Sequence, residues 1–174
     1  INALGEHSVR NALMAAAMAY AVGANLTNVK QGLAKFSPVG GRMSRHIGIN
    51  NALIIDDSYN ANPDSVRAAI DALKQSGNLS WLILGDMGEV GNQGPEFHRE
   101  VGAYAAEQGV TKLFVLGDQS QFALQGFEAV RKNDGAIAST AKHFADMDSL
   151  IMQLRDALHA QSSGSNQHLN ILVK

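Results

Sequence analysis

The chain has no cysteine and only three prolines among its 174 residues. Without cysteine it can form no disulfide and no thiolate metal site. No apolar run approaches the roughly 20 residues that a membrane-spanning helix needs. Positive and negative side chains nearly balance, giving a net charge of -2. Composition therefore gives no electrostatic reason to expect a nucleic-acid or membrane partner.

Two phosphate-binding motifs are also missing. The sequence has no Gly-x-x-x-x-Gly-Lys-Ser/Thr loop, and no strand-like run is followed by Gly-x-Gly-x-x-Gly, so dinucleotide binding is unsupported. The histidines show no metal-ligand spacing. We therefore expect no metal site made by this chain alone. His98 by itself is more typical of a surface or capping residue than of a catalyst.

Apolar runs and helical patterns alternate from about residue 45 onward. Strands are predicted at 45–49, 52–56, 80–84, 112–116, 136–139 and 168–173. Helices are predicted at 63–76, 95–108, 121–132 and 146–160, the last with Met147, Leu150, Ile151, Leu154 and Leu158 facing inward. Strands that alternate with helices imply parallel pairing through right-handed crossovers, and uniformly apolar strands fit a sheet covered on both faces. The predicted fold is α/β, a Rossmann-like three-layer domain with a mostly parallel sheet.

Asn50-Asn51 separates the predicted strands 45–49 and 52–56. Asn tolerates the left-handed backbone of tight hairpin turns. We therefore expect a two-residue hairpin, which places one antiparallel strand beside strand 52–56.

The first 36 residues have a different character. Residues 6–23 form an amphipathic helical pattern, and Thr27 is expected to cap a second helix whose Val29, Leu33 and Phe36 face inward. Such a pair cannot form a core alone. Residues 37–44 are rich in Pro, Gly and Ser and are predicted to be a hinge linker. The abrupt start at Ile1 and end at Lys174 suggest a part of a longer protein, with 45–174 as a domain truncated at its end.

Polar residues gather where the predicted strands end. Asp56 and Asp57 follow the strand at 52–56, and Tyr59, Asn60 and Asn62 come next, before a helix that starts with Pro63. In open α/β sheets ligands bind outside the carboxyl ends of the strands. Asp and Asn also cap helices, and spacing alone does not separate the two interpretations.

Glycines accompany the other candidate residues. The second strand is followed by Gly85-Asp86-Met87-Gly88-Glu89-Val90-Gly91, and Arg42 follows Gly40-Gly41. Glycine lets a backbone bend tightly or approach a ligand, and an arginine beside it can reach a phosphate. A flexible loop with solvated carboxylates and a solvated arginine in a hinge are the simpler alternatives.

Together these motifs resemble the Mur ligase family over the whole chain. The resemblance rests on Gly5-x-His7-x-x-x-Asn11-x-x-x-Ala15-Ala16, Phe36-x-Pro38-Val39-x-Gly41-Arg42-Met43, Asp56-Asp57-Ser58-Tyr59-Asn60-Ala61-Asn62-Pro63 and Leu84-Gly85-Asp86-Met87-Gly88-Glu89-x-Gly91. His98-x-x-Val101-Gly102 follows at the family's spacing. Ser8 departs from the pattern, since the family usually has a second Asn there, and this leaves Asn11 as the better candidate for an adenine contact.

The resemblance implies an ATP-dependent amide-forming ligase of peptidoglycan synthesis. ATP would phosphorylate the terminal carboxylate of UDP-N-acetylmuramoyl-tripeptide, and the amine of D-alanyl-D-alanine would attack the acyl phosphate. The enzyme would be cytoplasmic and monomeric. Residues 1–36 would end the central ATP-binding domain, and 45–174 would be nearly all of the closing C-terminal domain. The P-loop, the Mg²⁺ ligands and the carbamylated lysine of the family would lie outside this chain, so no catalytic residue is assigned and the chain alone is expected to be inactive.

The same resemblance assigns roles to individual residues. The nucleotide would be bound by Asn11 at the adenine, Asp57 at the ribose, Arg42 on domain closure, and Tyr59 and Asn62 along the same seam. Asp86, Glu89 and Asn60 are expected on the side of D-alanyl-D-alanine.

Two other interpretations are open. A phospho-receiver signalling module would use the residue types found at Asp56, Asp57, Asp118, Thr140 and Lys174. The extra hairpin strand and the Gly-Asp-Met-Gly-Glu loop have no counterpart in receivers. A related ligase that adds another amino acid, such as a folylpolyglutamate synthase, is opposed by the Tyr-Asn-Ala-Asn-Pro run.

Overall fold

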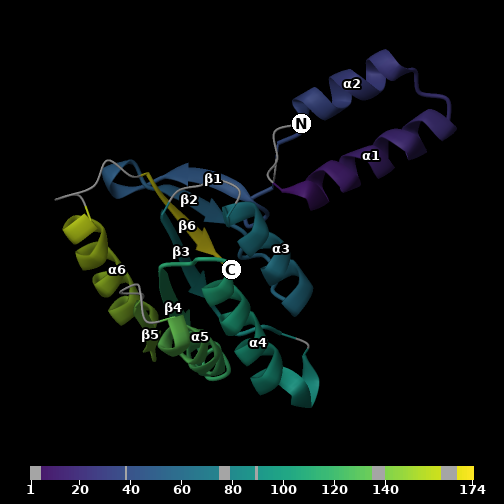
Figure 1. Cartoon of the computed structure of the whole chain (residues 1–174). Coiled ribbons are helices and arrows are strands. Elements are labelled where there is room, and N and C mark those ends of the chain that lie inside the picture. The colour runs from purple at the N-terminus through teal and green to yellow at the C-terminus, as the bar shows by residue number, and fades with distance from the viewer. Residues whose placement is uncertain (1–4, 38, 75–78, 89, 135–139, 162–167) are drawn as a thin grey trace.

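A six-stranded sheet forms the body of the molecule, and two helices project from it (Figure 1). The computed structural model describes residues 5–37, 39–74, 79–88, 90–134, 140–161 and 168–174. The helices are α1 (Glu6–Ala21), α2 (Leu26–Lys35), α3 (Pro63–Lys74), α4 (Gly94–Glu107), α5 (Gln121–Asp134) and α6 (Met147–Gln161), with 3-10 turns η1 (Ile49–Asn51) and η2 (Gly91–Gln93). The strands are β1 (Ser44–Ile47), β2 (Leu53–Asp56), β3 (Leu79–Leu84), β4 (Lys112–Leu116), β5 (Thr140–Phe144) and β6 (Leu169–Val173).

The strand order is β1-β2-β6-β3-β4-β5. β1 pairs antiparallel with β2, and every other pair is parallel, which confirms the predicted mostly parallel sheet with one antiparallel strand. The chain steps from β2 to β3, β4 and β5 and then returns to place β6 between β2 and β3. The parallel strands therefore end at one edge, and the last residues of the chain lie at its centre.

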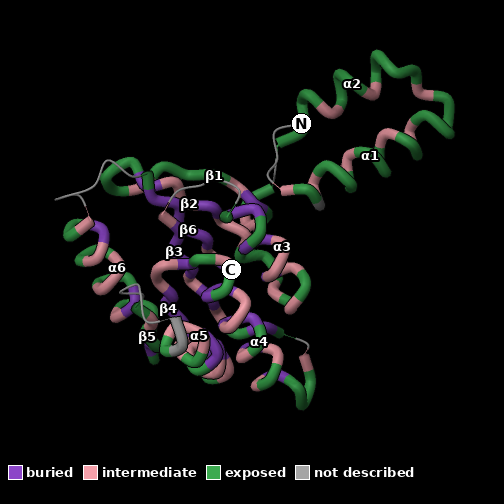
Figure 2. The backbone as a smooth tube through the Cα atoms, viewed as in Figure 1, coloured by how far each residue is buried: buried purple, intermediate pink, exposed green. Residues whose placement is uncertain are grey.

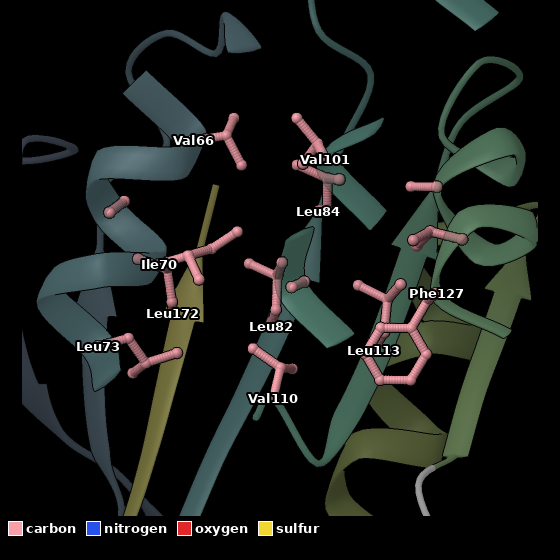
Figure 3. Packing of buried hydrophobic residues seen from close by; sticks show 14 of the residues in the cluster. Val66, Ile70, Leu73, Leu82, Leu84, Val101, Val110, Leu113, Phe127 and Leu172 are labelled. Atoms are coloured by element: carbon pink, nitrogen blue, oxygen red, sulfur yellow. The ribbon is translucent and has the colours of Figure 1, made fainter. Parts of the chain in front are cut away.

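Helices cover both faces of the sheet, as the sequence predicted. Leu82, Leu84 and Leu172 point toward α3, α4 and α5 (Figure 3), whereas the neighbouring Trp81 and Ile171 pack with α6 on the other face. This alternation follows from the two-residue period of a strand. Full burial of a leucine or isoleucine side chain contributes about 1.5–3 kcal/mol, so these two layers hold the domain together.

Two glycines set the close packing of α4 against α5. A Cβ atom at Gly102 would lie 1.8 Å from the carbonyl oxygen of Ala123, and one at Gly126 would lie 1.9 Å from that of Arg99. No side chain fits at either position while the two backbones meet. The close approach therefore depends on both glycines.

The predicted two-residue hairpin between β1 and β2 is wrong. Ile47 pairs with Leu53, so the connection runs over residues 48–52 and contains η1. Asn50 and Asn51 do adopt left-handed backbone, with φ of 56° and 60°. The Asn50 side chain also donates to the carbonyl of Leu158, which attaches the connection between β1 and β2 to helix α6.

Three further predictions need correction. Asn25, not Thr27, caps α2, because its side chain accepts the backbone N–H of Asn28. Met147 and Ile151 of α6 are exposed rather than inward-facing. The strand predicted at 136–139 lies outside the described residues, and β5 occupies residues 140–144 instead.

The helices α1 and α2 stand apart from the sheet (Figure 2). None of their described side chains is buried; Val29 and Leu33 are half-buried, whereas Phe36 is exposed, so its predicted inward-facing position is wrong. The lack of burial among these described side chains agrees with the prediction that the pair forms no core of its own. Among the described helices, none is long and apolar enough to cross a membrane.

Candidate functional site

A cleft of about 670 Å³ opens between the start of α1, the linker before β1, and the turn from β2 to α3. Five of the predicted site residues line it, namely Asn11, Arg42, Asp57, Tyr59 and Asn60. Ser8 and Lys174 line it as well. Residues separated by more than 100 positions in sequence therefore face one space. Position 8 belongs to the cleft despite its departure from the family pattern.

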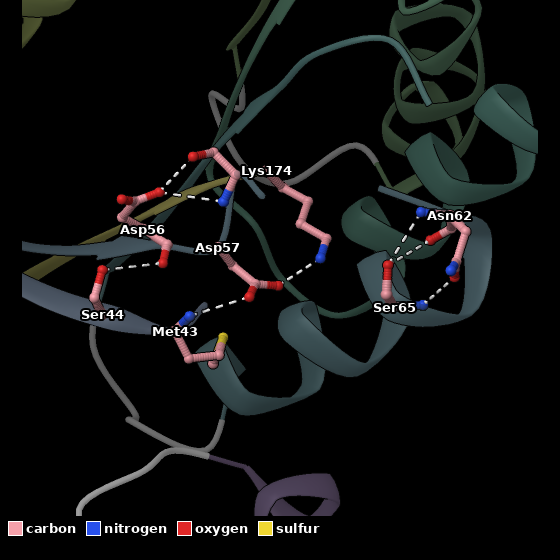
Figure 4. A network of polar contacts seen from close by, with 8 residues as sticks. Met43, Ser44, Asp56, Asp57, Asn62, Ser65 and Lys174 are labelled. Atoms are coloured by element: carbon pink, nitrogen blue, oxygen red, sulfur yellow. Dashed lines mark hydrogen bonds and ion pairs between the residues drawn. The ribbon is translucent and has the colours of Figure 1, made fainter. Parts of the chain in front are cut away.

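The linker is fastened to the turn that follows β2. The backbone N–H of Gly41 donates to Asp56 Oδ2 over 3.1 Å, and that of Met43 donates to Asp57 Oδ1 over 3.1 Å. The N–H of Tyr59 donates in return to the carbonyl of Gly41 over 2.9 Å. Figure 4 shows the contact between Met43 and Asp57. The two carboxylates thus fix the linker backbone directly before β1.

Gly41 is required for this close approach. Its φ is 75°, and an added Cβ would lie 3.1 Å from the backbone nitrogen of Tyr59. A left-handed φ strains residues that carry a side chain. Gly40 has neither constraint, since no atom would lie within 4 Å of its Cβ.

Arg42 lies over Tyr59. The guanidinium carbon is 4.2 Å from the centre of the Tyr59 ring, a cation–π geometry. Both residues are exposed. The ring therefore holds a positive, multiply donating group at the surface of the cleft, where it can meet an anionic ligand.

Asp57 pairs with Lys174, a residue that the sequence did not assign to the nucleotide site. The Lys174 Nζ lies 2.5 Å from Asp57 Oδ2, and the two side chains are 3% and 16% exposed. The pair exists because β2 and β6 are neighbours: Asp56 aligns with Val173, and the Asp57 N–H donates to the carbonyl of Val173. In the sequence Lys174 directly follows an apolar run, and only the receiver alternative used it, together with Asp56 and Asp57.

Asp56 has a different task from Asp57. The hydroxyl of Ser58 donates to its Oδ1 over 2.6 Å. This bond, with the backbone N–H groups of Ser58 and Gly41, lowers the pKa of the Asp56 carboxyl below its ordinary value, while burial opposes the shift. Asp56 is not among the residues that line the cleft. It stabilises the turn and the linker.

Asn62 caps α3. Its side-chain oxygen accepts the N–H of Ser65 over 2.8 Å, and its own N–H donates to the Ser65 hydroxyl over 3.1 Å. These reciprocal contacts are those of a helix N-terminus. Asn62 is also absent from the described lining of the cleft, so its predicted contact with a nucleotide stays a prediction.

The Gly-Asp-Met-Gly-Glu loop lies at the ends of β3 and β4, and none of its described residues lines the cleft. Asp86 Oδ1 accepts the N–H groups of Gln119 and Ser120 at the start of α5, over 3.0 Å and 2.7 Å. Glu89 lies outside the described residues. The predicted role of these carboxylates toward D-alanyl-D-alanine stays a prediction.

His98 is fully buried and holds this loop through contacts with backbone groups, so of the two expected roles, surface or capping, the surface role is wrong. Its Nε2 accepts the N–H of Met87 over 2.9 Å. Its Nδ1 lies 2.7 Å from the carbonyl oxygen of Gly94. Because Nε2 accepts a hydrogen bond, the hydrogen of the ring is on Nδ1, which donates to Gly94, and the ring is neutral in this arrangement.

No group of three His, Asp or Glu side chains that could hold a metal ion occurs within the described part of the chain. Asp57, a carboxylate that lines the cleft, is already paired with a lysine. The expectation that Mg²⁺ is held by residues outside this chain stays a prediction.

Comparisons with known proteins agree on one family. Residues 41–163 match the family model for the Mur ligase, glutamate ligase domain. The UDP-N-acetylmuramoyl-tripeptide–D-alanyl-D-alanine ligase of Escherichia coli (strain K12) is 36% identical over 170 residues, which is 98% of this chain and 34% of that protein. The enzyme of the same name from Haemophilus influenzae is 40% identical over 148 residues, 85% of this chain and 30% of that protein.

The fold agrees with these sequence matches. A crystal structure of MurF from Acinetobacter baumannii superposes with a TM-score of 0.82 at 29% identity, covering 98% of this chain and 35% of that one. The chain thus spans about a third of the length of the relatives that it matches. With a family model that covers most of its residues, the chain belongs to the Mur ligase family.

Proposed function

We propose that this chain is part of an ATP-dependent ligase that joins D-alanyl-D-alanine to UDP-N-acetylmuramoyl-tripeptide in peptidoglycan synthesis. The names of the similar proteins support this choice within the family. The observation that carries it is the cleft, in which Asn11, Arg42, Asp57 and Tyr59 face one space.

The proposed reaction has two steps. The terminal carboxylate of the tripeptide attacks the γ-phosphorus of ATP, which forms an acyl phosphate and releases ADP. The amine of D-alanyl-D-alanine then attacks the acyl carbon, and the tetrahedral intermediate expels phosphate and leaves an amide, with one proton lost from the amine. Such chemistry depends mainly on positioning the reactants and offsetting phosphate charge.

The cleft residues suit the nucleotide in that scheme. Arg42 offers a planar group of donors that can pair with phosphate or ribose oxygens. Asp57 retains lone pairs that can accept ribose hydroxyls, because its two contacts in the structure use only part of its capacity. Asn11 would face the adenine from α1, and Tyr59 supports Arg42.

The dipeptide side is proposed for Asn60, Asp86 and Glu89. Of these, Asn60 lines the cleft. Asp86 is bound to the start of α5, so we propose that it shapes the loop.

Domain closure would bring the two sides of the cleft together. We propose residues 1–36 as the end of the central domain, 37–44 as the linker and 45–174 as the C-terminal domain. Ser44 already belongs to β1, and residues 41–43 are bonded to the turn after β2. Hinges are a few residues that absorb large backbone changes, so the bend would fall on residues 37–40.

The remaining assignments follow the same proposal. The enzyme would be a cytoplasmic monomer that uses ATP with Mg²⁺, and this chain alone would be inactive. The receiver alternative is disfavoured by the strand order. Receivers are doubly wound in the order 2-1-3-4-5, with the last strand at an edge, whereas here the last strand lies between β2 and β3.

The test is phosphate release by the full-length protein with ATP, UDP-N-acetylmuramoyl-tripeptide and D-alanyl-D-alanine, each omitted in turn. Release that needs all three supports the proposal. Release with glutamate or another amino acid in place of the dipeptide would assign the chain to a different ligase. Labelling of Asp118 by acetyl phosphate, without any ligation, would favour the receiver alternative.

A further inference from the structure

Lys174 is the more deeply buried partner of the ion pair in the cleft, and the proposed ligase reaction assigns it no role. Its side chain is 3% exposed and its Nζ lies 2.5 Å from Asp57 Oδ2. Its backbone is fixed as well, since its N–H donates to the carbonyl of Ile83 and its carbonyl accepts the N–H of Gly85. The ammonium group therefore reaches Asp57 from an anchored position at the centre of the sheet edge.

The Asp57 carboxylate is held from two sides. Oδ1 accepts the N–H of Met43 in the linker, and Oδ2 accepts from Lys174 at the end of β6 (Figure 4). A carboxylate with both oxygens bonded cannot rotate freely, so its unused lone pairs keep one direction. The neighbouring Asp56 is satisfied by Ser58 and Gly41 and does not line the cleft. Of the two neighbouring carboxylates, Lys174 therefore pairs with Asp57, the one that lines the cleft.

Charge gives a second reason for the pair. The charged residues that line the cleft are Arg42, Asp57, Asp64 and Lys174. An unpaired carboxylate that is largely removed from water would repel the phosphates of a nucleotide. Lys174 balances Asp57, and Asp64 lies 3.6 Å from the guanidinium of Arg67. Arg42 therefore remains as the positive group at the cleft, with its guanidinium over Tyr59.

We propose that Lys174 is a positioning residue for the nucleotide: it orients and neutralises Asp57 so that this carboxylate can accept the ribose hydroxyls. The inference rests on the proposed nucleotide site. Lys174 acts through Asp57 and makes no contact with the nucleotide itself.

The test is the dissociation constant of Mg-ATP for the full-length protein, measured by calorimetry. The variants are Lys174→Met, which keeps the length of the side chain without its charge, and Lys174→Arg, which keeps the charge. We expect Lys174→Met to weaken binding about tenfold, since hydrogen bonds to charged groups contribute at least that factor, and Lys174→Arg to restore most of it. Lys132→Met makes the same chemical change on the exposed face of α5 and should bind as the wild type does.

A double-mutant cycle with Asp57→Asn separates positioning from direct contact. If Lys174 acts through Asp57, the two substitutions together weaken binding no more than Asp57→Asn alone. Additive losses would mean that Lys174 touches the nucleotide and would overturn the proposal. Thermal unfolding of each variant, with Lys174→Arg as the folded reference, shows how much of the protein is folded. If the weaker binding of Lys174→Met is explained entirely by unfolded protein, the proposal is also overturned.

The outcomes distinguish this inference from the proposed function. Wild-type affinity in a folded Lys174→Met protein would overturn the inference alone. If Lys174→Met weakens ATP binding but the wild-type protein joins no dipeptide, the inference is supported and the proposed reaction is overturned. A full-length protein that binds no ATP would overturn both.

Discussion

The guanidinium carbon of Arg42 lies 4.2 Å from the centre of the Tyr59 ring, and both residues line the cleft. Arg42 comes from the linker and Tyr59 from the turn after β2, and the hydrogen bond from the Tyr59 N–H to the Gly41 carbonyl holds the two segments together. The ring is therefore a support for a cation that would otherwise move freely in solvent. Removing either partner should affect ligand binding more than folding.

Arg42→Ala should leave the fold intact and depress turnover. Both partners are exposed, and surface substitutions usually change stability by no more than about 0.5 kcal/mol. If Arg42 bonds to the nucleotide, kcat/KM for ATP should fall at least about tenfold, since hydrogen bonds to charged groups contribute that much. Steady-state kinetics of the full-length protein measure this, with Arg45→Ala on the exposed edge strand as the control. Unchanged kinetics would remove Arg42 from the site.

His98→Ala should destabilise the protein by about 2–4 kcal/mol, because it opens a cavity and leaves the buried N–H of Met87 without its acceptor. Urea unfolding measures the change. His168→Ala, at an exposed position beside β6, is the control and should be nearly neutral. Equal stability of the two variants would contradict a role for His98 in holding the loop.

Five of the predicted site residues line the cleft, and the sequence could bring them together because they belong to motifs through which the chain resembles one family. Arg42, Asp57, Tyr59 and Asn60 lie within two such runs, and only Asn11 had to be brought in from another segment. Lys174 was missed as a partner of Asp57 because the pairing depends on strand order. Hydrophobic periodicity predicts that residues 168–173 form a strand, but it does not say that this strand enters the sheet beside β2.

Asn62 and Asp86 show a second limit. Asp and Asn side chains bind ligands and cap helices with the same atoms, so the residue type does not decide between the uses. In the structure Asn62 caps α3, and Asp86 accepts two backbone N–H groups in the turn before α5. His98 shows a third limit, since its burial requires the loop to fold back over α4 and no local pattern encodes that return.

Asp86→Ala should lower stability by about 1–3 kcal/mol, because two backbone N–H groups in the turn before α5 would lose their acceptor. Its carboxylate accepts the N–H groups of Gln119 and Ser120. Asp118→Ala changes the same residue type at an exposed position in the turn that Asp86 contacts, and it is the control. Thermal unfolding compares them. A stable Asp86→Ala protein with poor affinity for D-alanyl-D-alanine would instead favour the predicted substrate role.

Ser58→Ala should weaken the protein at neutral pH and not at acid pH. The Ser58 hydroxyl is the main cause of the lowered pKa of Asp56. A carboxyl group whose pKa is lowered by folding contributes stability above its unfolded pKa of about 3.9, and this is lost as the pH falls through the folded value. The difference in unfolding midpoint between variant and wild type should therefore shrink below about pH 4. A difference as large at pH 3 as at pH 7 would show that the charge of Asp56 is not its source.

Gly41→Ala and Gly40→Ala form a matched pair that locates the hinge. An alanine at Gly41 would combine a φ of 75° with a Cβ 3.1 Å from the Tyr59 nitrogen, so it should destabilise the attachment of the linker by about 1–2 kcal/mol. An alanine at Gly40 meets no atom within 4 Å and should leave the unfolding midpoint nearly unchanged. If the chain bends at residues 37–40, Gly40→Ala should still lower kcat, because the added side chain narrows the backbone angles available during closure. Wild-type turnover in Gly40→Ala would place the hinge elsewhere. Wild-type stability in Gly41→Ala would mean that Asp56 and Asp57 do not fix the linker.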